Sequence, residues 1–559
     1  MKKSLPVKFV SLFRFLLILL TLFSLNIIVV SQSDQDEIDA IIADMTLEQK
    51  VGQMFMVNLF GSELTYVGLD MLQIWQPGAV VIMENNLSTP QGIASLTNIY
   101  QHTIMDSGGI PLLVATDQEG GLIQRLREGF TNFPAPMLLT ATADSDLIYR
   151  TAQAMAIELR SVGINMNLAP VADLNTNINN PIIGRRSAGN DIELVNQMLQ
   201  SFIAGLQMNN VLATVKHFPG HGDTQTDSHL ELPIITADRD RLFSVELPPF
   251  IASIEAGVGT VMVSHIWFTT IEPQENVPAS LSYNVVTGLL REELGFDGII
   301  MTDALDMDAI DTVYGSAEAS IRAIQAGVDL IAIGANVGEA RQAQAMQAVV
   351  DAVRDGEIDE AQIDRSVRRI LLAKSQMGIL DWSPIDVDNL DLNPPENDAL
   401  IQEIFNLGTT VAYDENNLIP LAEDETVAII YPANRSSIRR ECEQYRTDIR
   451  WQGISNSPSQ SEIDGAVSLA NQVDTVIVFT RNAYYDDGQT ALVNGLPAEN
   501  TIVVALHSVY DWLRFRDIAT YVLTYSPLDP AIPGACAILF GQIPANGQLS
   551  VDLTQFLDQ

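Results

Sequence analysis

The sequence predicts an α/β protein, with a (β/α)8, TIM-like barrel followed by a smaller α/β domain that has a mostly parallel sheet. First, short apolar runs alternate with helical patterns from residue 34 to about residue 378, as in parallel sheets whose strands are buried on both faces. Second, a stretch rich in Asp, Asn and Pro interrupts this alternation, which then resumes. Third, 559 residues, 47% of them hydrophobic, suffice for two or three domains with separate cores.

The first alternation contains eight apolar runs, each typical of a buried strand. They are residues 51–57, 79–83, 111–116, 164–168, 211–215, 260–264, 298–302 and 329–333. Helical patterns lie between most of them, such as residues 194–208 and 316–326. Eight strand–helix units within residues 32–380 fit a (β/α)8 barrel with insertions, which we expect to be the catalytic domain.

A second domain is expected after a linker at residues 381–397, where Asn393-Pro-Pro-Glu is typical of a break between elements. Four further apolar runs follow, at residues 426–431, 474–479, 501–505 and 521–525. Helical patterns are found near residues 461–471 and 530–541. Residues 398–559 are therefore predicted to form the smaller α/β domain.

The N-terminal segment has the pattern of an export signal. Four basic residues precede an apolar stretch at residues 15–30, namely Lys2, Lys3, Lys8 and Arg14. An uncleaved membrane anchor is the alternative, although a comfortable membrane span needs ~20 apolar residues. No cysteine follows the stretch directly, which argues against a lipid anchor. We expect residues 1–31 to place the rest of the protein outside the cytoplasm, either secreted or held by this segment.

The charge balance excludes one class of partner. The formal net charge is −40, so nucleic acid and anionic lipid are not expected to bind, and the simplest interpretation is a soluble acidic surface. The two cysteines, Cys442 and Cys536, both lie late in the chain. Export would permit a disulfide between them, and two buried thiols are an equally acceptable arrangement.

Titratable residues are concentrated in one loop. Of the six histidines, His217, His221 and His229 fall within the 14 residues that follow the run at residues 211–215. Asp223 and Asp227 stand among them. A loop of this kind at a strand end is where enzymes place their chemistry.

Polar residues also follow the neighbouring predicted strands. Asp117 follows the third run, Asp173 the fourth, Lys216 the fifth, His265 the sixth and Asp303 the seventh. In a (β/α)8 barrel the carboxyl ends of all strands meet at one face, where the active site lies. Residues almost 190 positions apart are therefore expected to share one pocket.

Four motifs give the sequence a family resemblance. They are Lys216-His-Phe-Pro-Gly-His-Gly-Asp-Thr with Asp227-Ser-His229, Met301-Thr-Asp-Ala-Leu305, Asp117-Gln-Glu-Gly-Gly121 and Gly184-Arg-Arg-Ser187. In this order they resemble glycoside hydrolase family 3, in its β-N-acetylhexosaminidase branch. The resemblance is strong over residues 36–380 and weaker in the C-terminal domain.

The resemblance implies that Asp303 is the nucleophile. A carboxylate can attack an anomeric carbon to form a glycosyl-enzyme, and attack by water then gives net retention. The alternative role of Asp303 is a helix N-cap, but its place after an apolar strand favours catalysis. We assign the neighbouring Asp306 and Asp308 to the start of a helix.

The resemblance further implies that His229 is the acid/base and that Asp227 orients it. A carboxylate can hold an imidazole in one tautomer and stabilise its charged form. A group that titrates near neutrality can protonate the leaving oxygen and then deprotonate water. A neutral base also repels the nucleophile less than a second carboxylate would.

Five residues resemble the contacts to sugar hydroxyls in this family: Asp117, Arg125, Arg186, Lys216 and His217. Carboxylates accept hydrogen bonds from hydroxyl groups and arginine can fork onto them. For Arg186, a salt bridge across the barrel mouth is a real alternative. Two departures leave substrate detail open, since Leu122 stands where Arg is frequent in the family and Ala188 where Phe is common.

A metal site is the less favoured interpretation of the histidine loop. Zinc would need three or four converging ligands, whereas the glycines around His221 and Asp223 fit a tight loop equally well. No metal and no cofactor is therefore expected. Of the other histidines, we assign His265 to the pocket wall and His102 and His507 to structural positions.

Together these features predict an exported, retaining β-N-acetylglucosaminidase. Its partner would be a small glycan with terminal GlcNAc, such as a cell-wall fragment or a chito-oligosaccharide. A β-glucosidase and a GlcNAc phosphorylase of the same family are alternatives, and a catalytically inactive glycan-binding protein is an alternative of another class. No residue of the C-terminal domain is assigned to catalysis.

Overall fold

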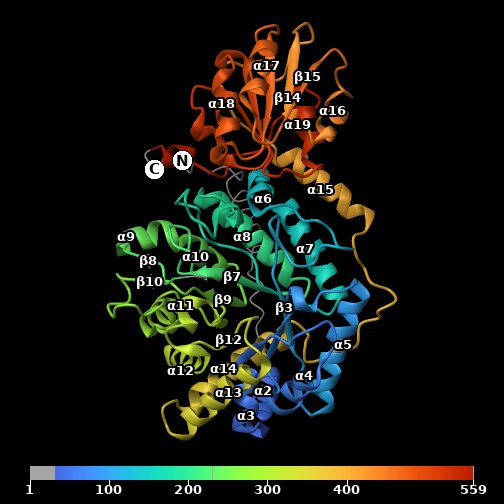
Figure 1. The fold of residues 1–559 in the computed structure, drawn as a ribbon. Helices are drawn as coiled ribbons and strands as arrows, with labels where there is room; N and C mark the ends of the chain where they lie inside the picture. Colours follow the sequence, from blue (N-terminus) through green and yellow to red (C-terminus); the bar gives the residue numbers. More distant parts are fainter. Residues whose placement is uncertain (1–31, 229–230, 558–559) are drawn as a thin grey trace, which may run out of the picture.

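The computed structural model describes residues 32–228 and 231–557. The expected signal or anchor segment, residues 1–31, lies outside the described residues, and so does His229. A larger N-terminal domain and a smaller C-terminal domain lie one above the other in Figure 1. No helix in the described part of the chain is both long and apolar enough to cross a membrane.

The larger domain is built on eight parallel strands. They are β1 (Phe55–Val57), β2 (Ala79–Val81), β3 (Leu113–Thr116), β6 (Met166–Asn167), β7 (Leu212–Phe218), β9 (Thr260–Val263), β11 (Ile299–Thr302) and β12 (Ile331–Ala332). Each strand pairs with the next in sequence, β12 pairs with β1, and a bridge between Met301 and Leu330 joins β11 to β12. The ring is therefore a (β/α)8 barrel, as the alternation of apolar runs predicts.

The first strand is shorter than the predicted residues 51–57. Residues 51–53 belong to α3 (Leu47–Gln53), and the strand begins only at Phe55. Thr46 and Gln49 form a capping box in which each side chain accepts a hydrogen bond from the other residue's amide. The cap therefore begins a helix that ends two residues before the first barrel strand.

Helices cover the outside of the ring (Figure 1). They include α2 (Gln32–Asp44), α5 (Pro90–Asp106), α7 (Ser145–Ser161), α8 (Ile192–Gln207), α10 (Pro248–Glu255), α12 (Gly315–Ala326), α13 (Glu339–Arg354) and α14 (Glu360–Gln376). The sequence of α8 explains this packing. Its buried residues Val195, Leu199, Phe202 and Leu206 recur at helical spacing, so one face of the helix is apolar and packs on the barrel.

The smaller domain has a six-stranded sheet. Its order is β13 (Thr410–Asp414), β18 (Thr520–Leu523), β17 (Thr501–Ala505), β16 (Thr475–Thr480), β14 (Val427–Pro432) and β15 (Arg450–Ile454), with only β13 antiparallel. The four inner strands lie where the apolar runs predict them. The edge strands β13 and β15 escaped prediction because they are mostly half-exposed and carry no continuous apolar run.

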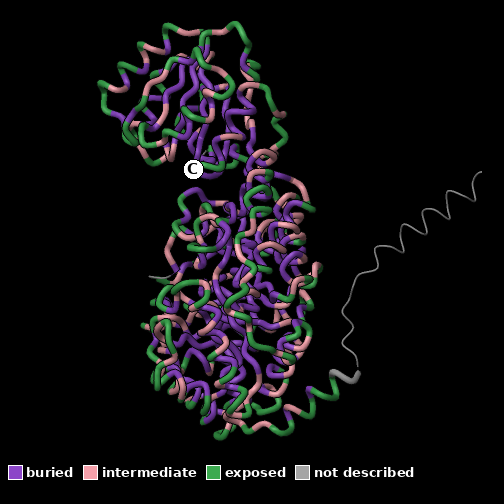
Figure 2. The backbone as a smooth tube through the Cα atoms, turned by 90° about the vertical axis from the view of Figure 1, so that its right-hand side faces the viewer, coloured by how far each residue is buried: buried purple, intermediate pink, exposed green. Residues whose placement is uncertain are grey.

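Helices flank this sheet on both faces: α16 (Ser436–Cys442), α17 (Gln460–Ala470), α18 (Asp487–Gly495) and α19 (Ala531–Leu539). The chain reaches the domain through α15 (Pro395–Gly408), which begins inside the stretch expected to be linker and packs on α6 (Pro136–Thr142). Figure 2 shows that buried segments run through the interior of each domain. Direct contacts join the two, such as the hydrogen bond from Asn175 Nδ2 to the Tyr510 hydroxyl.

Cys442 and Cys536 form a disulfide, which resolves the choice that the sequence leaves open. Cys442 is the last residue of α16 and Cys536 lies in α19, and both are fully buried. The bond therefore fastens two neighbouring helices of the C-terminal domain to each other.

Because the bond closes a loop of 94 positions, its loss should destabilise the C-terminal domain by about 4–5 kcal/mol. We expect the Cys442→Ser, Cys536→Ser double variant to melt at lower temperature than the wild type in calorimetry. Reductant should lower the melting temperature of the wild type and leave that of the variant unchanged. Equal melting of both proteins under oxidising conditions would contradict this role.

Candidate active site

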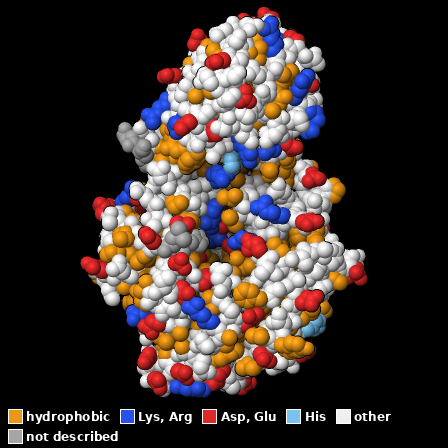
Figure 3. Space-filling view, in the orientation of Figure 1, with side chains coloured by type: hydrophobic (Ala, Val, Ile, Leu, Met, Phe, Trp, Pro, Cys, Tyr) orange, Lys and Arg blue, Asp and Glu red, His pale blue; other side chains and the backbone are white. Residues whose placement is uncertain are grey.

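A cavity of about 480 Å³ opens at the carboxyl end of the barrel strands. Its titratable lining residues are Asp117, Glu119, Arg125, Arg186, Lys216, His217, His221, Asp303, Asp306 and Asp308. All its described lining residues fall between Met56 and Asn336, so the barrel alone forms its wall. Figure 3 shows this side of the molecule hollowed below the smaller domain, with basic and acidic side chains inside.

Asp303 follows β11 directly and faces this cavity. Its backbone N–H donates to the Val263 carbonyl at 2.9 Å, which continues the pairing of β11 with β9. One carboxylate oxygen, Oδ1, accepts the Ala304 amide at 2.8 Å. The next helix, α11, begins only at Asp308, so Asp303 does not cap it.

The surroundings keep Asp303 ionised. Burial by itself would raise the pKa of this carboxyl group. The electrostatic influence of His217, His265 and Lys216, together with the hydrogen bond from the Ala304 amide, outweighs burial and holds the pKa below its ordinary value. The group is thus a carboxylate at neutral pH, which is the form that a nucleophile requires.

The assignment of Asp306 to a helix start is wrong. Asp308 does lie in the first turn of α11 (Asp308–Asp311), but Asp306 precedes the helix. Its Oδ2 accepts the amide of Asn336 at 2.8 Å and the Nδ2 of the same residue at 2.9 Å. Gly334 permits this approach, because a Cβ at that position would lie 2.0 Å from the Asp306 carboxyl carbon. Asp306 therefore fastens the loop after β12.

Buried charges surround the Lys216 ammonium group. Lys216 Nζ lies 2.8 Å from Asp117 and 2.8 Å from Glu119. Arg186 forks onto Glu119 with contacts of 2.7 and 3.0 Å, so the salt bridge considered for Arg186 exists, while Arg186 still lines the cavity. Burial would raise the pKa of Glu119, but Lys216 and Arg186 lower it to about 2.

Asp117 and Arg125 meet on the same side of the cavity. Arg125 Nη2 lies 3.5 Å from Asp117 Oδ2, and its other terminal nitrogen contacts Glu84. The structure thus brings together all five residues expected to contact sugar hydroxyls. Glu119, which holds two of them, had no role in the sequence-based assignment, although it lies in the same motif as Asp117.

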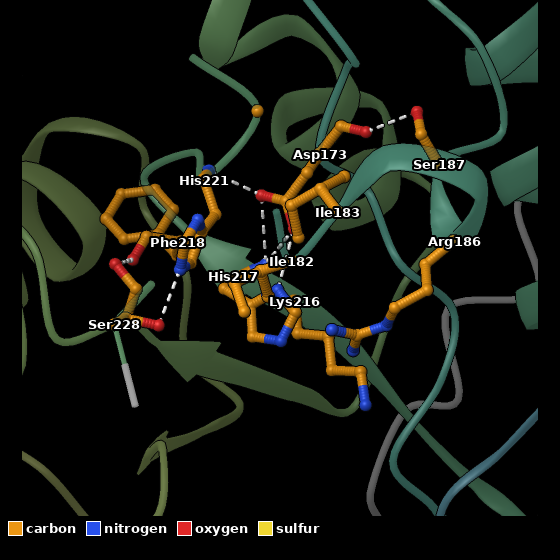
Figure 4. A network of polar contacts seen from close by, with 12 residues as sticks. Asp173, Ile182, Ile183, Arg186, Ser187, Lys216, His217, Phe218, His221 and Ser228 are labelled. Carbon is orange, nitrogen blue, oxygen red and sulfur yellow. Dashed lines mark hydrogen bonds and ion pairs between the residues drawn. The ribbon is translucent and has the colours of Figure 1, made fainter. Parts of the chain in front are cut away.

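Asp173 orients His217. The two side chains meet at 2.7 Å between Oδ2 and Nδ1, and the carboxylate also accepts the backbone amides of His217 and His221 (Figure 4). Burial would raise the pKa of Asp173, but His217 and the other donors lower it. An ionised carboxylate makes Nδ1 the protonated nitrogen, which leaves Nε2 for a ligand. Sequence reasoning noted Asp173 only as a strand-end residue, because its partner is 44 positions away.

His221 supports the loop that carries the expected acid/base. Its Nε2 lies 2.8 Å from Ser228 Oγ (Figure 4), and its Nδ1 lies 2.9 Å from Thr224 Oγ1. Burial, followed by the electrostatic influence of His217, lowers the pKa of His221 to about 4, so the ring is neutral at pH 7. Ser228 lines the cavity and directly follows Asp227, which is half-buried. The loop therefore reaches the cavity wall immediately before His229.

The remaining candidates lie in distinct surroundings. Asp223 pairs with Arg241 at 3.1 Å, and in the described ranges no three His, Cys, Asp or Glu side chains are grouped to hold a metal ion. His265 is fully buried, with Nε2 2.9 Å from the Ala304 carbonyl, so it fixes the carbonyl group of the residue that follows Asp303. His102 packs edge-on against Trp382, away from the cavity.

Comparison with known proteins gives consistent matches. Residues 46–373 match the family model described as the glycosyl hydrolase family 3 N terminal domain. The chain is 36% identical over 375 residues to the beta-hexosaminidase A of Pseudoalteromonas piscicida, covering 64% of this chain and 62% of that relative. It is 28% identical over 396 residues to a beta-N-acetylglucosaminidase/beta-glucosidase of Cellulomonas fimi, covering 68% and 67%.

A solved structure is similar over nearly the whole chain. It is that of a glycoside hydrolase family 3 beta-N-acetylglucosaminidase from Paenibacillus sp. str. FPU-7, with a TM-score of 0.79 and 34% identity. The match covers 91% of this chain and 99% of that one. The similarity therefore includes both domains.

The depressed pKa of His221 makes a prediction about stability. Because the folded-state pKa of about 4 lies below the ordinary 6.5, the unfolded chain binds more protons between these values. Stability should fall as the pH drops from 6.5 to 4, and the part due to His221 should be ~3 kcal/mol. We expect His221→Gln to flatten this dependence when urea unfolding is measured at several pH values. Parallel stability curves for wild type and variant would refute the assignment.

Proposed function

The chain belongs to glycosyl hydrolase family 3, and from this premise we propose that it is a retaining β-N-acetylglucosaminidase acting on small glycans with terminal GlcNAc. The observation that carries the proposal is an ionised Asp303 facing the cavity that Ser228, in the same loop as Asp227, also lines. Cell-wall fragments and chito-oligosaccharides are the substrates that we expect. The named activities of the relatives support this choice.

The proposed first step is attack by Asp303. The Ala304 amide holds Oδ1 of Asp303, and a carboxylate oxygen forms a bond to the anomeric carbon. The bond from that carbon to the leaving oxygen breaks, and His229 donates a proton to the departing oxygen. Asp227 stabilises the imidazolium form before the transfer.

In the second step water displaces Asp303 from the anomeric carbon. His229, now neutral, accepts a proton from water as its oxygen attacks the anomeric carbon, and the bond to Asp303 breaks. Both Asp303 and His229 return to their starting protonation states. Two displacements at one carbon retain its configuration.

The lining of the cavity favours the histidine over a carboxylate acid from the C-terminal domain. A β-glucosidase design would need such a carboxylate near the reacting bond. Within residues 32–228 and 231–557, the acidic groups that line the cavity all come from the barrel. This supports the reading of the Asp227 and His229 pair as the acid/base.

The charged network beside Asp303 is proposed to hold the sugar hydroxyls. Lys216 is buried and paired with both Asp117 and Glu119, so its position is fixed before a ligand arrives. Burial alone would lower the pKa of Lys216, but its two carboxylate partners raise it. Fixed charges of this kind lose little entropy when they bind a polar ligand.

We also propose that the enzyme acts outside the cytoplasm. The basic and apolar pattern of residues 1–31 supports export, with secretion or anchoring by this segment as the two outcomes. The Cys442–Cys536 disulfide supports it too, because such bonds persist mainly in oxidising compartments.

Substrate choice can be measured directly on protein lacking residues 1–31. We expect rapid hydrolysis of an aryl β-GlcNAc glycoside, slow hydrolysis of the matching β-glucoside, and no stimulation by phosphate. Preference for glucose would assign the enzyme to the β-glucosidases, and rates that rise with phosphate would assign it to the phosphorylases. Sugar binding without turnover would indicate a binding protein.

Two substitutions test the residue roles. Asp303→Asn should abolish turnover while the protein stays folded, because an amide is not a nucleophile here. His229→Ala should lower the rate by about 10²–10⁴, with a smaller loss in the first step for a very good leaving group. His102→Ala is the control, because His102 packs on Trp382 and does not line the cavity. This variant should keep the wild-type rate. An Asp303→Asn protein with unchanged rates would remove Asp303 from the mechanism.

A further inference from the structure

The C-terminal sheet has the topology of a ligand-binding α/β domain. β14 lies between β15 on one side and β16 on the other, and the chain continues outward from β16 through β17 to β18. The strand order therefore reverses its direction at β14 and β16. In open parallel sheets, ligands bind outside the carboxyl ends of the strands at such a reversal.

Basic side chains occupy this place. Arg481 directly follows β16, Arg435 lies three residues after β14, and His507 lies two residues after β17. Burial, together with the charges of Arg185, Arg481 and Arg435, lowers the pKa of His507 to about 4. Arg185, Arg435, Arg481 and His507 therefore lie close enough to interact electrostatically, although they come from distant segments. We name these four side chains the basic cluster.

The cluster has few counter-charges. In the part of the chain that the structure describes, the guanidinium groups of Arg185 and Arg481 form no hydrogen bond or ion pair with another side chain, and Arg185 is exposed. Arg435 Nη1 lies 3.8 Å from Asp529, whose Oδ1 already accepts a hydrogen bond from Ser437. Arginines left unpaired in a chain of net charge −40 point to an external anion.

A buried carboxylate in this domain, that of Asp511, already has hydrogen-bond partners. Asp511 accepts hydrogen bonds from the Tyr484 amide and the Thr480 hydroxyl. Burial raises its pKa to about 6, although the hydrogen bonds that it accepts oppose this rise. Asp511 thus holds the loop after β16 in place and does not neutralise the cluster.

The cluster lies at the edge of the active-site cavity. Arg185 is the neighbour of Arg186, which lines the cavity. The Tyr485 hydroxyl donates to the Ile178 carbonyl at 3.4 Å, so the loop after β16 contacts the barrel loop that carries Arg185. Figure 3 shows basic side chains and a histidine gathered between the two domains, directly above the hollow.

The backbone beside Arg481 adopts a costly conformation. Asn482 has φ of +144°, in a region that side chains rarely adopt. Such strain is concentrated at functional sites, where the surrounding structure keeps it in place.

We propose that Arg185, Arg435, Arg481 and His507 bind an oxyanion, a carboxylate or a phosphate, on the part of the glycan that leaves when the terminal sugar is removed. This inference rests on the proposed function. Guanidinium groups bind carboxylate and phosphate through paired hydrogen bonds, and the imidazole adds another donor. The C-terminal domain then selects the leaving group while the barrel performs the chemistry.

The test compares two aryl β-GlcNAc substrates with leaving groups of matched acidity, one neutral and one bearing an additional carboxylate. We expect kcat/KM of the wild type to favour the carboxylated substrate by about 10-fold or more, the size of a hydrogen bond to a charged group. Arg481→Gln and Arg185→Gln should each reduce this ratio towards one. Arg440→Gln, which removes an exposed pair with Glu441 in the same domain, is the control and should keep the ratio.

Titration of wild type and Arg481→Gln with inorganic phosphate separates the sources of the oxyanion. Phosphate that binds the wild type only and removes the substrate preference supports the proposal. Phosphate binding with a substrate ratio of one overturns the leaving-group assignment and gives the cluster to a free oxyanion. A ratio of one without phosphate binding overturns the site altogether. If the wild type cleaves neither substrate, the proposed function fails, and phosphate binding alone then decides whether the oxyanion site exists.

Discussion

Closure of the eight parallel strands into a ring is the constraint on which the rest of the structure depends. The bridge between Met301 and Leu330 and the pairing of β12 with β1 leave the barrel without an open edge. Every strand must then deliver its following residue to the same rim. Asp117, Lys216 and Asp303 meet there although they come from three separate strand ends. The chemistry of the site follows from this geometry, because no loop could bring such distant groups together with equal rigidity.

A second constraint is the balance of buried charge at that rim. Glu119 and Lys216 are almost completely buried, and either ion alone would be costly in such surroundings. Arg186 and Asp117 complete the network, so each buried charge has an opposite partner within 3 Å. The network thus fixes the side chains that face the cavity. Between the rim and the second domain the charges are not balanced in this way, because Arg185 and Arg481 form no ion pair with a carboxylate in the described chain.

The sequence predicts the parts of this protein that have a local physical cause. Strands buried on both faces are continuous apolar runs, so all eight barrel strands and the inner strands of the second sheet could be located. The edge strands β13 and β15 could not, because half-exposed strands keep polar residues. In the site, loop histidines and strand-end carboxylates stand out, but the contact between Asp173 and His217 depends on how two strands are placed side by side. The role of Asp306 was misjudged for the same reason, since its partner Asn336 belongs to the next strand's loop.

One contact between the domains has a consequence for the order in which the protein matures. The Ser550 carbonyl accepts the amides of Asn190 and Asp191, and Asn190 Oδ1 accepts the Asp552 amide across 362 positions of sequence. Gly189 lies so close that a Cβ there would be 2.2 Å from the Ser550 oxygen. The barrel loop that carries Arg185 and Arg186 therefore acquires its last partners only when these late residues have been synthesised. When translation has passed the barrel, all the described cavity-lining residues have been synthesised. The loop that supports some of them is complete only after the end of the second domain has been synthesised and has folded against it.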